Sequence, residues 1–321
     1  MKYFGQKIKG SFKSVPLQVR LPIIFFFTYS LLSYMHLLFP KDIWISVNVQ
    51  ELEAQHLPAL TSLRMIINIL IGPIFAVFAY HIYVKLKTHL LEKTEGKENR
   101  SKEVKQNGDK SNQTDTQNNR LISQKEIAMR DYLFVIFLLL FVMGNSIHYI
   151  GNYHSNLAVS EGLVYSNTFL GLYFYEELVA HLLILISIMG MGNVYVSLIL
   201  VHKKPTSLKR SLRLGLHFVG LTIGCGIAIM MIEGQSALVG IIPLLFIFIT
   251  VKNARKTKQP LKGSQSTQNS SKYSDIVKDY PIVKIFILIG IWYVVSVLIY
   301  VGLYGTTEVY PFLPQPSLLF S

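Results

Sequence analysis

YLFVIFLLLFVMGNSIHYIG, residues 132–151, is the stretch that decides the fold class of this chain. Its first twelve residues are apolar or aromatic, and the polar side chains of Asn145, Ser146 and His148 follow them. Twenty residues of α-helix are about 30 Å long, which is the thickness of the hydrocarbon core of a lipid bilayer. The stretch is therefore predicted to cross a membrane as a helix.

The whole chain has the composition of a membrane protein. Its 321 residues are 51% hydrophobic and 15% charged, and the apolar residues are gathered into long blocks. Seven blocks are long enough to be spans. They lie near 21–39, 60–84, 132–151, 170–200, 214–232, 236–251 and 282–304. We therefore expect an all-α polytopic membrane protein, a bundle of about seven transmembrane helices.

The 31 Lys and Arg residues are distributed unevenly between the segments that join these blocks. Four segments hold 28 of them, namely 1–20, 85–130, 203–213 and 252–281, whereas the connections on the other side of the membrane hold only Lys41. Basic segments next to spans resist translocation across the membrane. We therefore expect a cytoplasmic N-terminus and a C-terminus outside.

This topology divides the chain into a basic cytoplasmic N-terminus (1–20), a transmembrane domain (21–304) and an external tail (305–321). The linkers 92–126 and 256–275 are rich in Lys, Asn, Gln and Ser, so we expect them to be disordered. Their basic side chains are expected to attract anionic lipid headgroups, unless they serve only as topology signal and tether.

The net charge of +13 and the single cysteine exclude several classes of function. The charge comes from the basic loops around the spans, so we expect the lipid bilayer as partner and no nucleic acid. Cys225 alone allows neither an intrachain disulfide nor a cysteine-based metal site. Motifs for nucleotide binding and serine-hydrolase chemistry do not occur.

Polar side chains collect in the outer third of the predicted bundle. They are His36, Arg64, Asn145, His148, Asn152, His154, Glu176, Glu177, His181 and Glu233. Hydrocarbon offers no hydrogen bonds, so polar residues at that depth are expected to face the bundle interior. This collection of residues predicts a polar site near the outer face.

Two helical faces can form that site. Asn145, His148 and Asn152 are spaced i, i+3, i+7 and share one face of the third span. Glu177 and His181, in YEELVAH, are spaced i, i+4 and stack one turn apart on the fourth span. The loop between these spans is external, so the two faces can meet at similar depth as antiparallel neighbours.

The ligand types on these faces are those of a catalytic zinc centre. Such a centre has three protein ligands and a fourth position for a water whose pKa falls to about 7. His148, Glu177 and His181 are the candidate ligands, and His154, on another face or in the loop, is a further one. The sequence therefore predicts Zn²⁺ as the candidate cofactor.

Five more residues are candidates for catalytic roles around this metal. Glu176 or Glu233 can act as a base, and Asn145 and Asn152 can orient ligands or donate to a developing oxyanion. Arg64 can hold a carboxylate or phosphate, or pair with one of the glutamates. These assignments indicate a metal-dependent hydrolase acting on a lipid-like substrate from the bilayer.

Other functions use the same residues. A transporter, channel or sensor would use them to bind protons or a small ligand. Two histidines from different spans can also hold a b-type haem, and a structural or assembly factor would use them only as interhelical hydrogen bonds, worth about 0.6 kcal/mol each. The sequence leaves the choice between these functions open.

GNSIHYIGN and YFYEELVAH, residues 144–152 and 173–181, resemble a motif pair of uncharacterised prokaryotic multi-span membrane proteins. The pattern is an NxIH element followed by an acidic pair and a histidine. More distantly, the chain is similar to the CREST superfamily of alkaline ceramidases and progestin/adiponectin receptors, which implies seven spans and zinc-dependent amide hydrolysis. That superfamily has an HxxxH pair in its last span, whereas 282–304 contains no histidine.

Overall fold

The computed structural model describes nine stretches of the chain, which together hold all the predicted spans at least in part. They are residues 15–35, 44–46, 60–105, 113–160, 162, 166–201, 210–237, 241–258 and 280–306. The expected external tail is therefore described only at 305 and 306, and most of the expected linker 256–275 lies outside the described residues.

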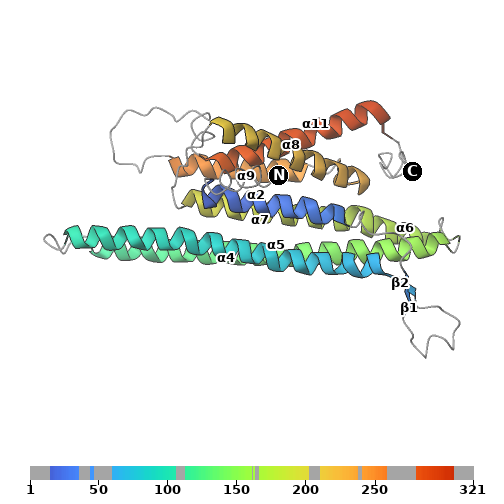
Figure 1. Cartoon of the computed structure of the whole chain (residues 1–321), viewed down its shortest axis with the longest axis horizontal. Coiled ribbons are helices and arrows are strands. Elements are labelled where there is room, and N and C mark those ends of the chain that lie inside the picture. Colours follow the sequence, from blue (N-terminus) through green and yellow to red (C-terminus); the bar gives the residue numbers. More distant parts are fainter. Residues whose placement is uncertain are drawn as a thin grey trace, which may run out of the picture.

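The described chain is a bundle of helices (Figure 1). In chain order the helices are α2 (Leu17–Met35), α4 (Leu63–Lys105), α5 (Gln113–Ser160), α6 (Asn167–Phe174), the π-helical turn η3 (Tyr175–Ala180), α7 (His181–Val201), α8 (Arg210–Glu233), α9 (Ile241–Lys258) and α11 (Pro281–Tyr304). Two short strands, β1 (Trp44–Ser46) and β2 (Leu60–Ser62), pair antiparallel with Trp44 opposite Ser62. The predicted all-α class is confirmed apart from this strand pair.

Five helical segments are long and apolar enough to cross a membrane. They are Leu70–Leu91, Gln124–His154, Phe169–Leu200, Leu214–Glu233 and Pro281–Tyr304. The other two expected spans correspond to α2 and α9, whose apolar parts are shorter within the described residues, at Val19–Tyr29 and Leu244–Asn253. Length and composition therefore confirm five of the seven predicted spans as candidates.

Helices α4 and α5 extend well beyond their apolar parts and form a long antiparallel pair (Figure 1). Residues 92–105 and 113–126, for which we expected disorder, belong to these two helices. A helix that is already nucleated gains one hydrogen bond for each further residue, and Lys, Glu and Gln are good helix formers. Continuation from a stable span therefore explains helix where composition alone indicates disorder.

Local sequence signals explain where several helices begin and end. Ser166 caps α6, because its side chain accepts a hydrogen bond of 3.1 Å from the backbone N–H of Phe169. Pro281 opens α11, where the missing N–H needs no partner. Gly305 ends α11 with a φ of 75°, a conformation that glycine adopts without steric cost.

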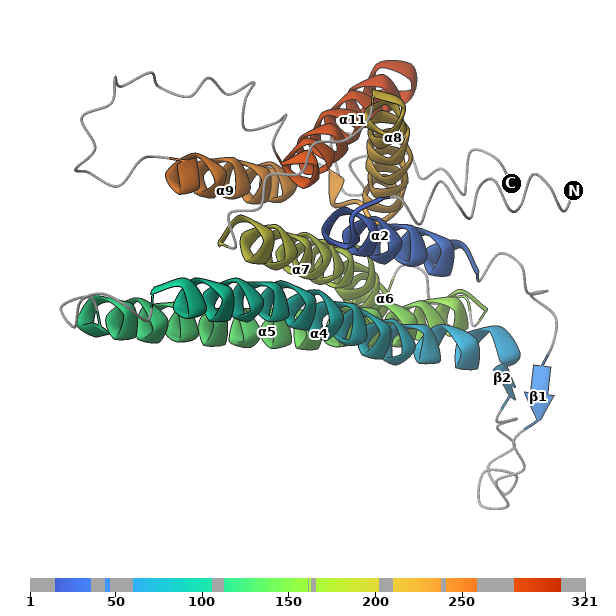
Figure 2. The same ribbon diagram turned by 60° about the vertical axis from the view of Figure 1, so that its left-hand side comes forward.

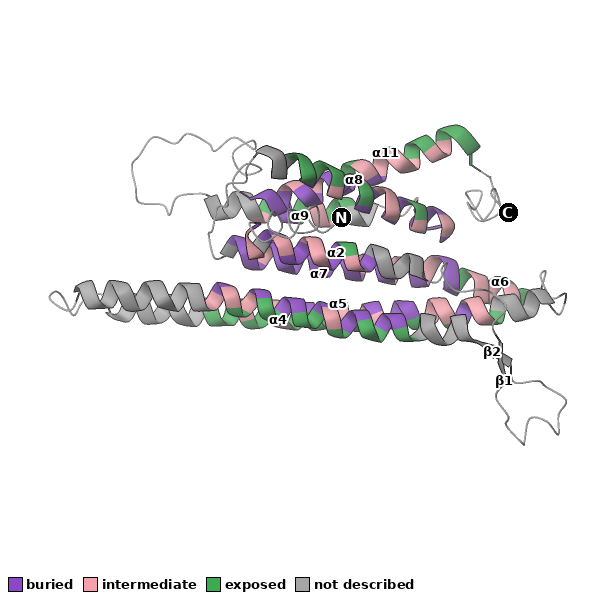
Figure 3. Ribbon diagram, in the orientation of Figure 1, coloured by how far each residue is buried: buried purple, intermediate pink, exposed green. Residues whose placement is uncertain are grey.

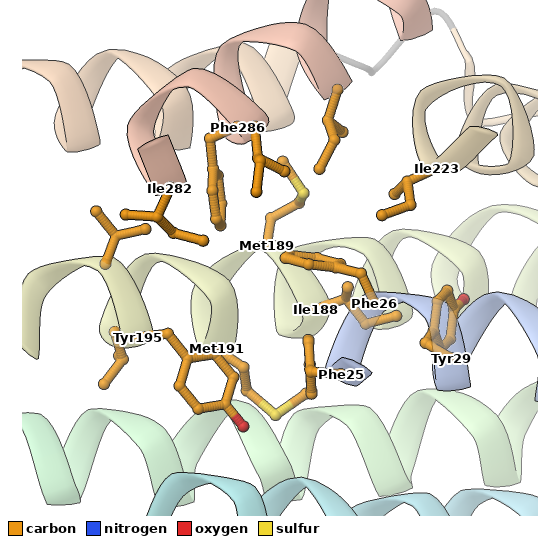
Figure 4. Packing of buried hydrophobic residues seen from close by; sticks show 14 of the residues in the cluster. Phe25, Phe26, Tyr29, Ile188, Met189, Met191, Tyr195, Ile223, Ile282 and Phe286 are labelled. Carbon is orange, nitrogen blue, oxygen red and sulfur yellow. The ribbon is translucent and has the colours of Figure 1, made fainter. Parts of the chain in front are cut away.

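Helix α7 lies at the centre of the bundle and is largely buried (Figure 3). It contacts α2, α4, α5, α8 and α9. Around it lies a core of aromatic side chains, with the Tyr195 ring 5.1 Å from Phe25 and 5.6 Å from Phe134 between centroids. Figure 4 shows Phe26, Met189 and Phe286 in the same core.

Helices α8 and α11 form a closely packed pair at one edge of the bundle, opposite α4 and α5 (Figure 2). Gly224 of α8 allows this approach, since a Cβ there would lie 2.7 Å from the Cβ of Trp292 and 2.7 Å from the carbonyl oxygen of Ile289. Small residues commonly permit close helix packing in membranes. The outward faces of the helices carry large apolar side chains such as Val77, which is 72% exposed.

Candidate functional site

Helix α5 carries Asn145, His148 and Asn152 in the second half of its apolar segment. Asn145 is buried, and its Nδ2 donates a hydrogen bond of 2.9 Å to the carbonyl oxygen of Phe141, one turn earlier. His148 and Asn152 are half-buried. The α5 part of the site therefore points at least partly into the bundle.

The π-helical turn η3 interrupts the regular helix that we expected across Glu176, Glu177 and His181. The backbone N–H of His181 donates to the carbonyl oxygen of Leu178. The carbonyl oxygens of Glu176 and Glu177 lie next to the His181 side chain. Single π-turns inside α-helices occur frequently at functional sites.

These two carbonyl groups determine which nitrogen of His181 carries the hydrogen. Nδ1 lies 2.9 Å from the carbonyl oxygen of Glu177 and 3.2 Å from that of Glu176. Carbonyl oxygens only accept hydrogen bonds, so Nδ1 must be the donor. In the neutral ring Nε2 then keeps its lone pair and can bind a proton, a hydrogen-bond donor or a metal ion.

His148 and His181 meet at the interface between α5 and α7. Their ring centroids are 4.5 Å apart, and the ring planes make an angle of 68°, an edge-to-face arrangement. Glu176, Glu177 and His181 are all buried, and the Oε2 atom of Glu177 lies 3.8 Å from Nδ1 of His181. The structure thus brings two imidazoles together beside the buried carboxyl group of Glu177.

Gly151 of α5 makes this meeting sterically possible. A Cβ at Gly151 would lie 2.8 Å from the Cβ of Glu176 and 3.3 Å from its Cα. Helix α5 and η3 can therefore approach closely only because this position has no side chain. His148 lies one turn before Gly151, so the same close approach brings its ring to His181.

Of the other predicted site residues, His154 points away from this group. His154 is exposed, with its ring beside Tyr153 at 5.4 Å, because six residues of helix turn it away from His148. Glu233 is half-buried at the last position of α8. Arg64 belongs to the first turn of α4, but its side chain lies outside the described residues, as does His36.

The predicted metal centre can be compared with this arrangement. Within the part of the chain that the structure describes, no group of three His, Cys, Asp or Glu side chains is arranged to hold a metal ion. A catalytic zinc ion needs three protein ligands at about 2.0–2.2 Å. The zinc centre therefore stays a prediction.

The turn that follows Glu233 at the C-terminal end of α8 forms a part of the site, and the sequence analysis identified only Glu233 in it. Gly234 lies directly against the His181 ring, and a Cβ at this position would overlap with the Cγ and Nδ1 atoms of that ring. Gln235 and Ser236 follow and are almost completely buried. The only sequence signal is EGQS at the end of an apolar block, which predicts no more than a helix end.

A second polar cluster joins α4, α5 and α7 on the side of the bundle towards the α4–α5 connection. Lys87 Nζ lies 2.5 Å from the carboxylate of Asp131, which also accepts a hydrogen bond of 2.7 Å from the Tyr83 hydroxyl. Arg130 Nε donates to the Ser197 hydroxyl at 2.7 Å. Along α5, Asp131 lies 17 residues before His148, or roughly 25 Å away, so the two clusters are separate.

Comparison of the chain with known proteins identifies no relative. No family model matches the chain, and no curated protein or solved structure does. Function must therefore be inferred from the site.

Proposed function

We propose that this chain is a multi-pass integral protein of the cell membrane that binds a proton or a small polar ligand between α5, η3 and α8, as a transporter, channel or sensor. In this proposal α2 and α9 cross the membrane together with the five longer helices. The concentration of 28 of the 31 Lys and Arg residues in four segments supports a cytoplasmic N-terminus and an external C-terminus.

This topology places the His148–His181 pair in the outer half of the membrane. It places the basic segments at the cytoplasmic leaflet, where they are proposed to lie against anionic lipid headgroups. A ligand would therefore reach the site from outside, or from the outer leaflet.

One observation carries the proposal, namely the edge-on contact of His148 and His181 beside the buried Glu176 and Glu177. Burying carboxyl groups is costly unless they are protonated or interact with a donor or a cation. Interhelical hydrogen bonds between polar side chains stabilise membrane bundles by only about 0.6 kcal/mol each. Imidazole and carboxyl groups can each take up or release a proton, so this arrangement supports binding of a proton or a polar ligand.

The proposal can be tested with protein reconstituted into liposomes that enclose a pH-sensitive dye. An imposed pH gradient should collapse faster than in empty liposomes, and His148→Gln, His181→Gln and Glu177→Gln should remove most of this effect. His154→Gln is the matched control, because His154 is exposed on the same helix as His148. A sensor would instead show ligand-dependent thermal stabilisation that the three variants lose. If neither property depends on these residues, the proposal is wrong.

A metal-dependent hydrolase of a lipid-like substrate is the second candidate. The hydrogen bond from His181 Nδ1 to the Glu177 carbonyl favours it, because metal-binding histidines are commonly oriented through their other nitrogen in this way. The lack of a three-residue metal group among the described residues argues against it. Elemental analysis before and after chelation decides: about one Zn²⁺ per chain, lost in His181→Ala, would favour the hydrolase.

A further inference from the structure

Helix α8 ends in a turn with a defined hydrogen-bond pattern. The backbone N–H of Ser236 donates to the carbonyl of Met231 at 2.9 Å, and that of Gln235 donates to Ile232 at 3.1 Å. These two bonds form a Schellman motif, in which the residue after the helix adopts a left-handed conformation. That residue is Gln235, with a φ of 50°, and no other non-glycine residue in the described stretches has a positive φ.

Gly234, the glycine of this turn, lies one residue before the position that has the left-handed conformation. Glycine is the usual residue at the left-handed position, because it has no Cβ. Here Gly234 precedes that position and does not have a positive φ, whereas Gln235 adopts the unfavourable conformation. Backbone geometry therefore does not require a glycine at 234.

The contact with the His181 ring, in contrast, does require a glycine at position 234. A Cβ at Gly234 would overlap with three atoms of the His181 ring, Cγ, Nδ1 and Cδ2. Local sequence rules are most often broken at functional sites, where another requirement is stronger. In this turn the requirement is space for one imidazole.

The turn itself is anchored by the helix pair at the edge of the bundle. The hydroxyl of Tyr293 on α11 donates a hydrogen bond of 2.9 Å to the carbonyl oxygen of Ala237. His181 is consequently held on two sides, by the carbonyl of Glu177 at Nδ1 and by the backbone of Gly234 against the ring. The position of the α8–α11 pair therefore sets where the ring can lie.

We propose that Gly234 is a positioning residue of the site, which holds the His181 imidazole against His148 with Nδ1 as its hydrogen-bond donor. The turn from Met231 to Ala237 is then the α8 wall of the site. This assignment deepens the proposed function and rests on it for its biological meaning, but it makes its own structural prediction.

Nuclear magnetic resonance of protein labelled with ¹⁵N-histidine, in lipid nanodiscs, tests this directly. The His181 signals, identified by their loss in His181→Gln, should show the neutral ring protonated at Nδ1. Gly234→Ala should shift them or replace them with a mixture of tautomers. Gly215→Ala, on the same helix with no atom within 4 Å of its added Cβ, should leave them unchanged. Unchanged His181 signals in Gly234→Ala would overturn the proposal.

A double-mutant cycle gives a second test that needs no spectral assignment. Gly234→Ala should lower the unfolding temperature when His181 is present and have little effect in a His181→Ala background, because the overlapping ring is gone. An equal loss in both backgrounds would show that Gly234 does not act through His181. Neither test measures transport or ligand binding. Positive results here, together with neither a flux nor a ligand-dependent stabilisation that depends on the site, would therefore refute the proposed function alone.

Discussion

Gly151 of α5 and Glu176 of η3 approach so closely that a Cβ on the glycine would lie 2.8 Å from the Cβ of the glutamate. This close approach aligns α5 with η3 and the start of α7 so that His148 lies next to His181. The site thus depends on a residue that takes no part in its chemistry.

Gly151→Ala should separate α5 from η3 and destabilise the protein. Inserting a methyl group into a packed interface typically costs about 1–3 kcal/mol, because neighbouring atoms must move. We expect a lower unfolding temperature in detergent and altered histidine signals. Gly171→Ala on α6 is the control, since nothing lies within 4 Å of its added Cβ. Equal stability of the two variants would contradict the contact described here.

Deleting Val179 should convert the π-turn into regular α-helix. The carbonyl groups of Glu176 and Glu177 would then accept from backbone N–H groups four residues later and no longer from His181 Nδ1. We expect the His181 ring to lose its preference for protonation at Nδ1, as seen by ¹⁵N chemical shifts. Val179→Ala keeps the chain length and should retain that preference. A deletion variant with native His181 signals would show that the π-turn is not what orients the ring.

Asp131→Asn should weaken the polar cluster of α4 and α5 only modestly. The side chains of Lys87 and Asp131 are 28% and 37% exposed, so water screens their attraction. Partly exposed ion pairs contribute about 0.2–1 kcal/mol to the free energy of unfolding. We expect chemical unfolding to show a decrease in that range. Tyr83→Phe, which keeps the ion pair, separates the effect of the hydroxyl. A decrease of more than about 3 kcal/mol in the free energy of unfolding would mean that the ion pair behaves as a buried one.

Cysteine labelling tests the proposed topology. Cys225 is the only native cysteine, so Cys225→Ser provides a background without thiols. In that background a membrane-impermeant maleimide added to intact cells should label Ser155→Cys and should not label Ser270→Cys. Labelling of both positions should occur after the membrane is permeabilised. The reverse pattern in intact cells would invert the topology derived from the Lys and Arg distribution.

The amino-acid pattern predicts the helices well where apolar runs are long. The expected spans 170–200, 214–232 and 282–304 agree with segments Phe169–Leu200, Leu214–Glu233 and Pro281–Tyr304 to within a residue. Burial of apolar side chains and satisfaction of backbone hydrogen bonds both favour helix in these runs. Polar composition was less informative, because 92–105 and 113–126 are helical extensions of the apolar segments of α4 and α5.

The spacing of polar residues identified the two faces of the site but not their geometry. An i, i+4 relation between Glu177 and His181 assumes an α-helix, whereas the structure has a π-turn that directs His181 Nδ1 to backbone carbonyls. A π-turn depends on the packing of neighbouring helices as well as on local propensity, so no pattern in YEELVAH reveals it.

The sequence by itself determined that this protein is a helical bundle with several segments long and apolar enough to span a membrane, because hydrophobicity and length act locally, segment by segment. Tertiary structure alone decided that His148, His181 and Gly234 meet, since their contact depends on how closely α5, η3 and α8 can approach. The physical reason is steric: the two glycines, Gly151 and Gly234, are needed for the space they leave, and that space is defined only by atoms distant in the chain.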